Sequence, residues 1–203
     1  TLRATFEPTS IDGGALRGAC PPQSVARTDS DFGPGQYILQ GGFAEGETLA
    51  VSFDVDTSEF PIRIDLMEVL FGTSGALVQT TTQWSVMVWD GTPASGSLVA
   101  SYSSDDIILP HLVMPPGTTG TIISVTIDPD DPDQIYVYND SGTGQFTVGF
   151  RVDAHNQPGT PCVSSPPVTH NAFPATDTSG LDYPTENWIN MVDGVACVCG
   201  SGW

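Results

Sequence analysis

The amino-acid sequence predicts an all-β protein, an antiparallel β-sandwich with roughly nine to eleven strands in two sheets. Several segments alternate apolar and polar residues with a period of two, which is typical of strands with one buried face. Gly (22) and Pro (17) together approach a fifth of the 203 residues without any repeat, which favours short strands and turns. No helical stripe extends beyond about two turns.

The region from residue 121 to residue 153 carries the strongest alternation. Its apolar positions are Ile123, Val125 and Ile127, then Ile135 and Val137, then Phe146, Val148, Phe150 and Val152. The two connections, residues 129–133 and 139–144, are rich in Pro, Asp, Asn and Gly, which favour turns. We therefore expect a three-stranded meander here that forms part of one sheet.

Further strands are predicted on both sides of this region. They cover residues 1–6, 36–43, 48–55, 62–71, 80–89, 97–102 and 105–113, with a closing hairpin of 187–192 and 195–199. Residues 44–47 are expected to form a hairpin turn. The apolar phase changes after Leu66, which indicates either a β-bulge or a strand covered on both faces.

One strand pair resembles a known kind of module. Trp84 to Pro93, followed by Gly96 to Ala100, is similar to the strand, Asp-Gly-x-Pro turn, Gly and strand of jelly-roll modules in large secreted bacterial proteins. The preceding strands from Gly42 to Phe71 are also similar. The resemblance implies a jelly-roll-like sandwich and transfers no functional residue, because such modules serve adhesive, carbohydrate-binding and structural roles.

The whole chain, residues 1–203, is expected to form a single domain. Residues 1–34 would supply a first strand and a loop that ties it down, and residues 157–203 would form a disulfide-stapled C-terminal segment. No run of about 18 apolar residues is present, so no membrane span is predicted.

The charge is strongly acidic. Twenty-four acidic residues face five basic ones, all of them arginine, and the net charge is −19. Such a chain is repelled by nucleic acids and anionic membranes, so neither is an expected partner. The charge favours solubility and association with divalent cations, and a solvated acidic surface suited to salty surroundings explains it equally well.

Four cysteines form an even set: Cys20, Cys162, Cys197 and Cys199. They predict a secreted protein with two disulfides, since Cys197 and Cys199 would form a strained ring with each other and are expected to reach Cys20 and Cys162. A metal site is the alternative. The zinc-ribbon spacing C-x-x-C is absent. The chain begins with Thr rather than Met, which indicates either a removed leader or a numbering that starts at a mature end.

Four aspartates, Asp128, Asp130, Asp131 and Asp133, crowd one predicted turn. Close carboxylates repel unless a hard cation bridges them, and Ca²⁺ accepts irregular oxygen ligands, so Ca²⁺ is the candidate cofactor. The pattern lacks the length, glycine and terminal Glu of an EF-hand. A solvent-facing turn without a ligand is the alternative interpretation.

Aromatic residues could bind sugars by stacking. Tyr136 and Tyr138 share one face of a predicted strand beside the acidic turn, which makes glycans candidate partners. Packing within the core or against another subunit is the alternative.

No catalytic signature is found, so an enzyme is not expected. His111, His155 and His170 have no metal-binding spacing, and no Ser lies in a G-x-S-x-G motif. The predicted function is a secreted, non-catalytic subunit, structural or adhesive, of a self-associating filament or surface layer. A carbohydrate-binding module, with or without a need for Ca²⁺, is the alternative, and a glycan hydrolase is the third interpretation.

Self-association suggests a role for the first strand. Leu2, Ala4 and Phe6 alternate with polar residues, so this segment is a candidate to complete the sheet of a neighbouring copy. Pairing of the same strand within its own domain is the alternative that the sequence leaves open.

Overall fold

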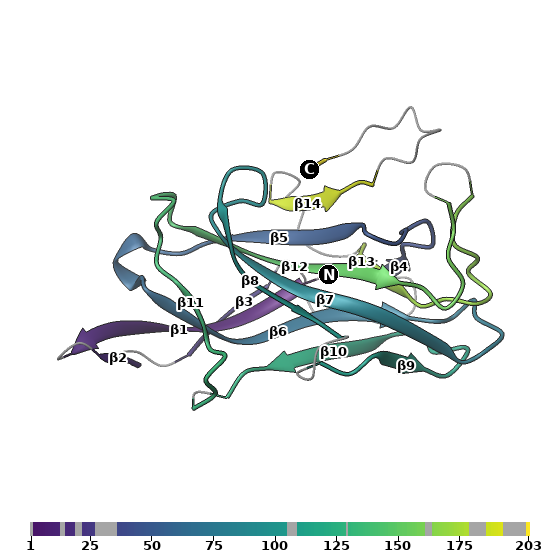
Figure 1. The fold of residues 1–203 in the computed structure, drawn as a ribbon, viewed down its shortest axis with the longest axis horizontal. Coiled ribbons are helices and arrows are strands. Elements are labelled where there is room, and N and C mark those ends of the chain that lie inside the picture. The colour runs from purple at the N-terminus through teal and green to yellow at the C-terminus, as the bar shows by residue number, and fades with distance from the viewer. Residues whose placement is uncertain are drawn as a thin grey trace.

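The structure is a computed structural model that describes residues 2–12, 15–18, 22–26, 36–104, 109–128, 130–160, 164–178, 186–192 and 202–203. Two antiparallel sheets pack face to face, which confirms the predicted β-sandwich (Figure 1). The one helical element in these ranges is a 3-10 turn, η1 (Thr57–Glu59). Within the same ranges no helix has the length and apolarity needed to cross a membrane.

One sheet has eight strands. They are β1 (Leu2–Asp12), β2 (Ala15–Gly18), β3 (Gln23–Ala26), β4 (Tyr37–Leu39), β6 (Ile62–Gly72), β10 (Thr121–Thr126), β11 (Ile135–Val137) and β13 (Phe173–Asp177). The long strand β6 is the centre of this sheet, because β1, β10, β11 and β13 all pair with it.

The other sheet has six strands. They are β5 (Thr48–Asp54), β7 (Thr80–Asp90), β8 (Ser97–Ser103), β9 (Leu112–Met114), β12 (Gln145–Ala154) and β14 (Asn187–Asn190). β12 lies between β5 and β7, and the four apolar residues of its predicted stripe are all buried. The described ranges thus hold more strands than predicted, because β2, β3 and β13 lie where no strand was predicted.

Aromatic rings from both sheets meet in the core. Phe6 of β1 lies edge-on to Phe146 of β12, with ring centroids 5.5 Å apart. Phe150 of β12 contacts Phe71 of β6 at 4.8 Å and stacks on Trp84 of β7 at 5.0 Å. The contacts of Phe6 and Phe71 with β12 join the two sheets, whereas the stack of Phe150 on Trp84 lies within the six-stranded sheet.

The predicted irregularity near Leu66 is a β-bulge in β6. Thr5 of β1 lies opposite Leu66 and Phe6 lies opposite Ile64, so Asp65 has no partner residue on β1. The inward-facing side chains of β6 change at this point from Ile62 and Ile64 to Met67, Val69 and Phe71. The bulge therefore keeps the apolar residues on both sides of Asp65 in the core.

The predicted three-stranded meander is wrong. β10 and β11 do not pair with each other, because both pair with β6 and lie one after the other along it. β12 belongs to the opposite sheet. The acidic turn is therefore an excursion within an interrupted edge strand rather than the turn of a hairpin.

The predicted hairpin across residues 44–47 is also wrong. The turn exists, with the Glu47 amide donating to the Ala44 carbonyl at 3.2 Å. It links β4 of one sheet to β5 of the other, so the flanking strands do not pair. The β7–β8 hairpin is confirmed. β14 pairs with β5, and residues 195–199 of the closing hairpin lie outside the described residues.

Candidate functional site

The first strand, β1, lies between β6 and β3 in the eight-stranded sheet, and the position that it fills is called the β1 slot. Its Leu2, Ala4 and Phe6 side chains are almost fully buried, with 3%, 0% and 1% of their surface exposed. Burying such side chains removes apolar surface from water, which stabilises the fold by about 25 cal/mol per Å². These three residues are the assembly-strand candidates from the sequence, and in this structure they complete the core of their own chain.

β1 has a neighbour on each side. β6 pairs with Leu2 to Pro8, and β3 pairs with Arg3 to Phe6 (Figure 1). The Thr5 hydroxyl also lies 3.0 Å from the Ser24 hydroxyl of β3. The strand therefore pairs within its own domain, which is the alternative that the sequence left open.

Two ion pairs join β1 to β6 on the outer face of the sheet. Arg3 Nε lies 2.5 Å from Glu68 Oε2, and Arg63 Nη2 contacts Glu7 Oε2. Arg63 Nε also lies 2.6 Å from Asp65 Oδ1. The hydrogen bond to Asp65 is the main cause that raises the pKa of the Arg63 guanidinium, which stays charged.

Sequence reasoning missed these ion pairs. Arg3 lies in the predicted strand of residues 1–6 but Glu7 lies beyond it, and no pattern in the sequence identifies their partners in β6. Those partners lie about 60 residues further along, and only the folded register brings them opposite β1.

The two tyrosines of the predicted sugar platform lie together. Their ring centroids are 6.4 Å apart with a tilt of 39°, while Ile135 and Val137 point into the core. Tyr138 is 51% exposed, and the Tyr136 hydroxyl donates to the Gln134 side chain. Tyr136 also sits opposite Arg63, so the platform borders the ion pairs of β1.

The acidic turn is held by its own backbone. The Asp130 amide donates to Asp128 Oδ1 at 3.0 Å, and the Asp133 amide donates to Asp131 Oδ1 at 2.8 Å. Asp131 and Asp133 line a cavity of about 190 Å³ beside Tyr102. Burial, with these two carboxylates as lesser causes, raises the pKa of the Tyr102 hydroxyl, which donates to the Asp133 carbonyl at 2.9 Å.

The described residues hold no group of three or more His, Cys, Asp or Glu side chains arranged to hold a metal ion. The aspartate side chains that bind backbone amides still have oxygens that could meet a hard cation. The Ca²⁺ site at Asp128, Asp130, Asp131 and Asp133 therefore stays a prediction.

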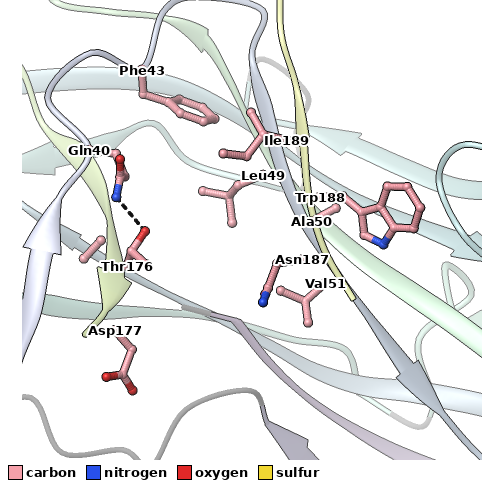
Figure 2. Close-up of a pocket in the computed structure, with 11 residues that line it drawn as sticks. Gln40, Phe43, Leu49, Ala50, Val51, Thr176, Asp177, Asn187, Trp188 and Ile189 are labelled. Carbon is pink, nitrogen blue, oxygen red and sulfur yellow. Dashed lines mark hydrogen bonds between the residues drawn. The ribbon is translucent and has the colours of Figure 1, made fainter. Parts of the chain in front are cut away.

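A second cavity, of about 220 Å³, opens at the opposite edge of the sandwich, between β4 and β13 of one sheet and β5 and β14 of the other. Figure 2 shows Gln40 and Thr176 joined by a hydrogen bond of 2.7 Å on one wall, and Leu49 and Ile189 facing them. Most of the lining is apolar, with Asp177 and Asn187 among the polar groups. The cavity lies where the two sheets separate at their edges.

The three histidines lie apart from one another. His155 is buried, its Nε2 lies 2.8 Å from the Phe43 carbonyl oxygen, and burial lowers the pKa of its imidazole. His170 Nδ1 contacts the Thr169 hydroxyl at 2.9 Å. No described contact joins a histidine to both a serine and a carboxylate in the manner of a hydrolase triad.

The four cysteines, Cys20, Cys162, Cys197 and Cys199, lie outside the described residues, so the two disulfides stay a prediction.

No family model, no curated protein and no solved structure matches this chain. Its function is therefore argued from its own residues.

Proposed function

We propose that this chain is a secreted, non-catalytic β-sandwich that acts as a structural or adhesive subunit of an extracellular assembly, a filament or a surface layer. The observation that carries this proposal is the β1 slot. A single extended strand supplies three buried side chains to the core and pairs on both sides. The same slot could therefore be filled by the β1 strand of a neighbouring copy.

Exchange of a strand is an economical way to join subunits. The exchanged strand makes in the neighbouring copy the same contacts that it makes within its own chain, including the contact between Phe6 and Phe146. The join therefore needs no new interface to evolve. A head-to-tail series of such contacts propagates into a filament when it does not close into a ring.

The composition supports an extracellular subunit. A chain with 24 acidic and five basic residues stays soluble, and its even number of cysteines suits an oxidising compartment. Because lysine is absent, covalent joining through lysine side chains is not available, which leaves non-covalent contacts.

Deletion of residues 1–8 tests the proposal. We expect the wild type to form oligomers or filaments, measured by sedimentation and electron microscopy, and the deleted chain, which lacks three core side chains, to be less stable and not to assemble. The Ile122→Ser variant, which changes an exposed residue of β10, is the matched control and should still assemble. A wild type that sediments only as a monomer, or a deleted chain that still assembles, would refute assembly by strand exchange.

A carbohydrate-binding module is the second candidate. It is favoured by the exposed ring of Tyr138, which lies beside Tyr136 and close to the acidic turn. Exposed aromatic rings can stack on sugar rings. A glycan array at millimolar calcium should then show binding that the Tyr138→Ala variant loses and the Ile122→Ser control keeps. Binding to no glycan by the wild type would remove this candidate.

A further inference from the structure

The outer faces of β1 and β6 carry complementary charges at matched positions. Arg3 lies directly opposite Glu68, and Glu7 lies directly opposite Arg63. Each is a cross-strand pair in contact. Opposite charges at such positions stabilise a strand pair, and like charges destabilise it. Along β1 the positive Arg3 therefore precedes the negative Glu7, and β6 places the negative Glu68 and the positive Arg63 opposite them.

The β-bulge makes this pattern specific for one register. The charges of β1 are four positions apart (3 to 7), whereas those of β6 are five apart (63 to 68), and Asp65 absorbs the difference. A shift by one residue would turn the apolar side chains out of the core. A strand in the parallel direction would bring Arg3 toward Arg63 and Glu7 toward Glu68.

The charges of β6 have partners that do not depend on β1. The Ser124 hydroxyl of β10 donates to Glu68 Oε1 at 3.1 Å, and Asp65 Oδ1 accepts from Arg63 Nε at 2.6 Å. Tyr136 of β11 pairs with Arg63 on the side of β6 away from β1. The two β6 residues are thus held in place by β10 and by the bulge, ready to meet an incoming strand.

We propose that Glu68 and Arg63 select the strand that fills this slot, and that the strand they accept from outside is β1 of a second copy of this chain, antiparallel to β6. This inference rests on the proposed strand exchange and names its partner and its specificity determinants. The complementary charges admit the chain's own sequence and disfavour strands with the reverse order, which is how interfaces reject wrong partners.

The test uses two full-length variants, each of which has a pair of like charges between β1 and β6 of its own chain. Arg3→Glu places two acids opposite each other, and Glu68→Arg places two arginines opposite each other. When the two variants are mixed, both exchanged strands meet a complementary β6. The Arg3 side chain is 40% exposed and the Glu68 side chain is 15% exposed, so the reversal at Arg3 is the milder of the two changes.

We expect native mass spectrometry of an equal mixture to show a ratio of heterodimer to total homodimer that exceeds the statistical ratio of one to one by roughly fivefold. A mixture of Glu68→Arg with Arg151→Glu is the control. Arg151 has a similar side-chain exposure of 35% but lies on the other sheet, so this mixture should give no such excess. The double variant Arg3→Glu/Glu68→Arg should recover most of the stability lost by the single variants.

The outcomes separate the two ideas. Two results would overturn the selection by charge and leave strand exchange intact. One is a statistical mixture of dimers. The other is a double variant whose loss of stability equals the sum of the losses of the two single variants. A different result would overturn the proposed function: the double variant recovers its stability, but the wild type and every mixture contain only monomers. In that case β1 of a second copy does not pair with β6 either. Neutral variants, Arg3→Gln and Glu68→Gln, provide the same comparison if a reversed variant does not fold.

Discussion

Replacement of Phe6 by Ala should remove the anchor of β1. The Phe6 ring is 1% exposed and lies edge-on to Phe146 of the other sheet at 5.5 Å. Truncation of a buried Phe removes its apolar contacts and leaves a cavity, and such changes cost about 3–5 kcal/mol. In a chain of this size that corresponds to a fall in melting temperature of about 10 °C.

Urea unfolding followed by tryptophan fluorescence measures this cost, because Trp84 stacks on Phe150 in the same core. The Ile38→Ala variant is the matched control. Ile38 is 59% exposed on β4, so its truncation should change the free energy of unfolding by about 0.5 kcal/mol or less. A cost below about 1 kcal/mol for Phe6→Ala would show that β1 is not anchored in the core as described.

Four further outcomes are expected. Burial lowers the pKa of His155 below 6.5, so the unfolded state binds more protons just below pH 6.5. Stability should be complete above about pH 6.5 and fall as the pH decreases toward the folded-state pKa, and His155→Gln should reduce this slope in urea titrations. Asp90→Ala should cost about 3 kcal/mol in thermal unfolding, because the buried Asp90 carboxylate accepts the amides of Asp140 and Ser141 at 2.8 and 3.1 Å. Excess chelator should lower the melting temperature, and Asp131→Asn should reduce that effect. Thiol titration of the denatured, unreduced protein should find no free cysteine.

Contrary results have defined meanings. An unchanged pH slope in His155→Gln would assign the acid sensitivity to other groups. An Asp90→Ala variant as stable as the wild type would show that water replaces the lost acceptor. An unchanged melting curve in chelator, with no bound metal in elemental analysis, would remove the Ca²⁺ site. Four free thiols would remove the disulfides.

The sequence by itself determined which residues face the core. Alternation at Phe146, Val148, Phe150 and Val152 placed all four inside, because a strand directs successive side chains to opposite faces wherever it lies. For the same reason the change of phase after Leu66 predicted either a bulge or a strand covered on both faces, and the structure shows the bulge. The β7–β8 hairpin was also predictable, since a short turn brings its two strands together locally.

Only the tertiary structure decided which strands are neighbours. Alternation names the buried face of a strand but not the sheet that the strand joins, so β10, β11 and β12 were wrongly predicted to pair in series. The same holds for the candidate site. Tyr136 and Tyr138 were found from the sequence because they are two positions apart in the predicted strand, although β11 ends at Val137. The Arg3–Glu68 and Glu7–Arg63 pairs were not, because the register of two strands distant in the sequence is set by the packing of the whole core.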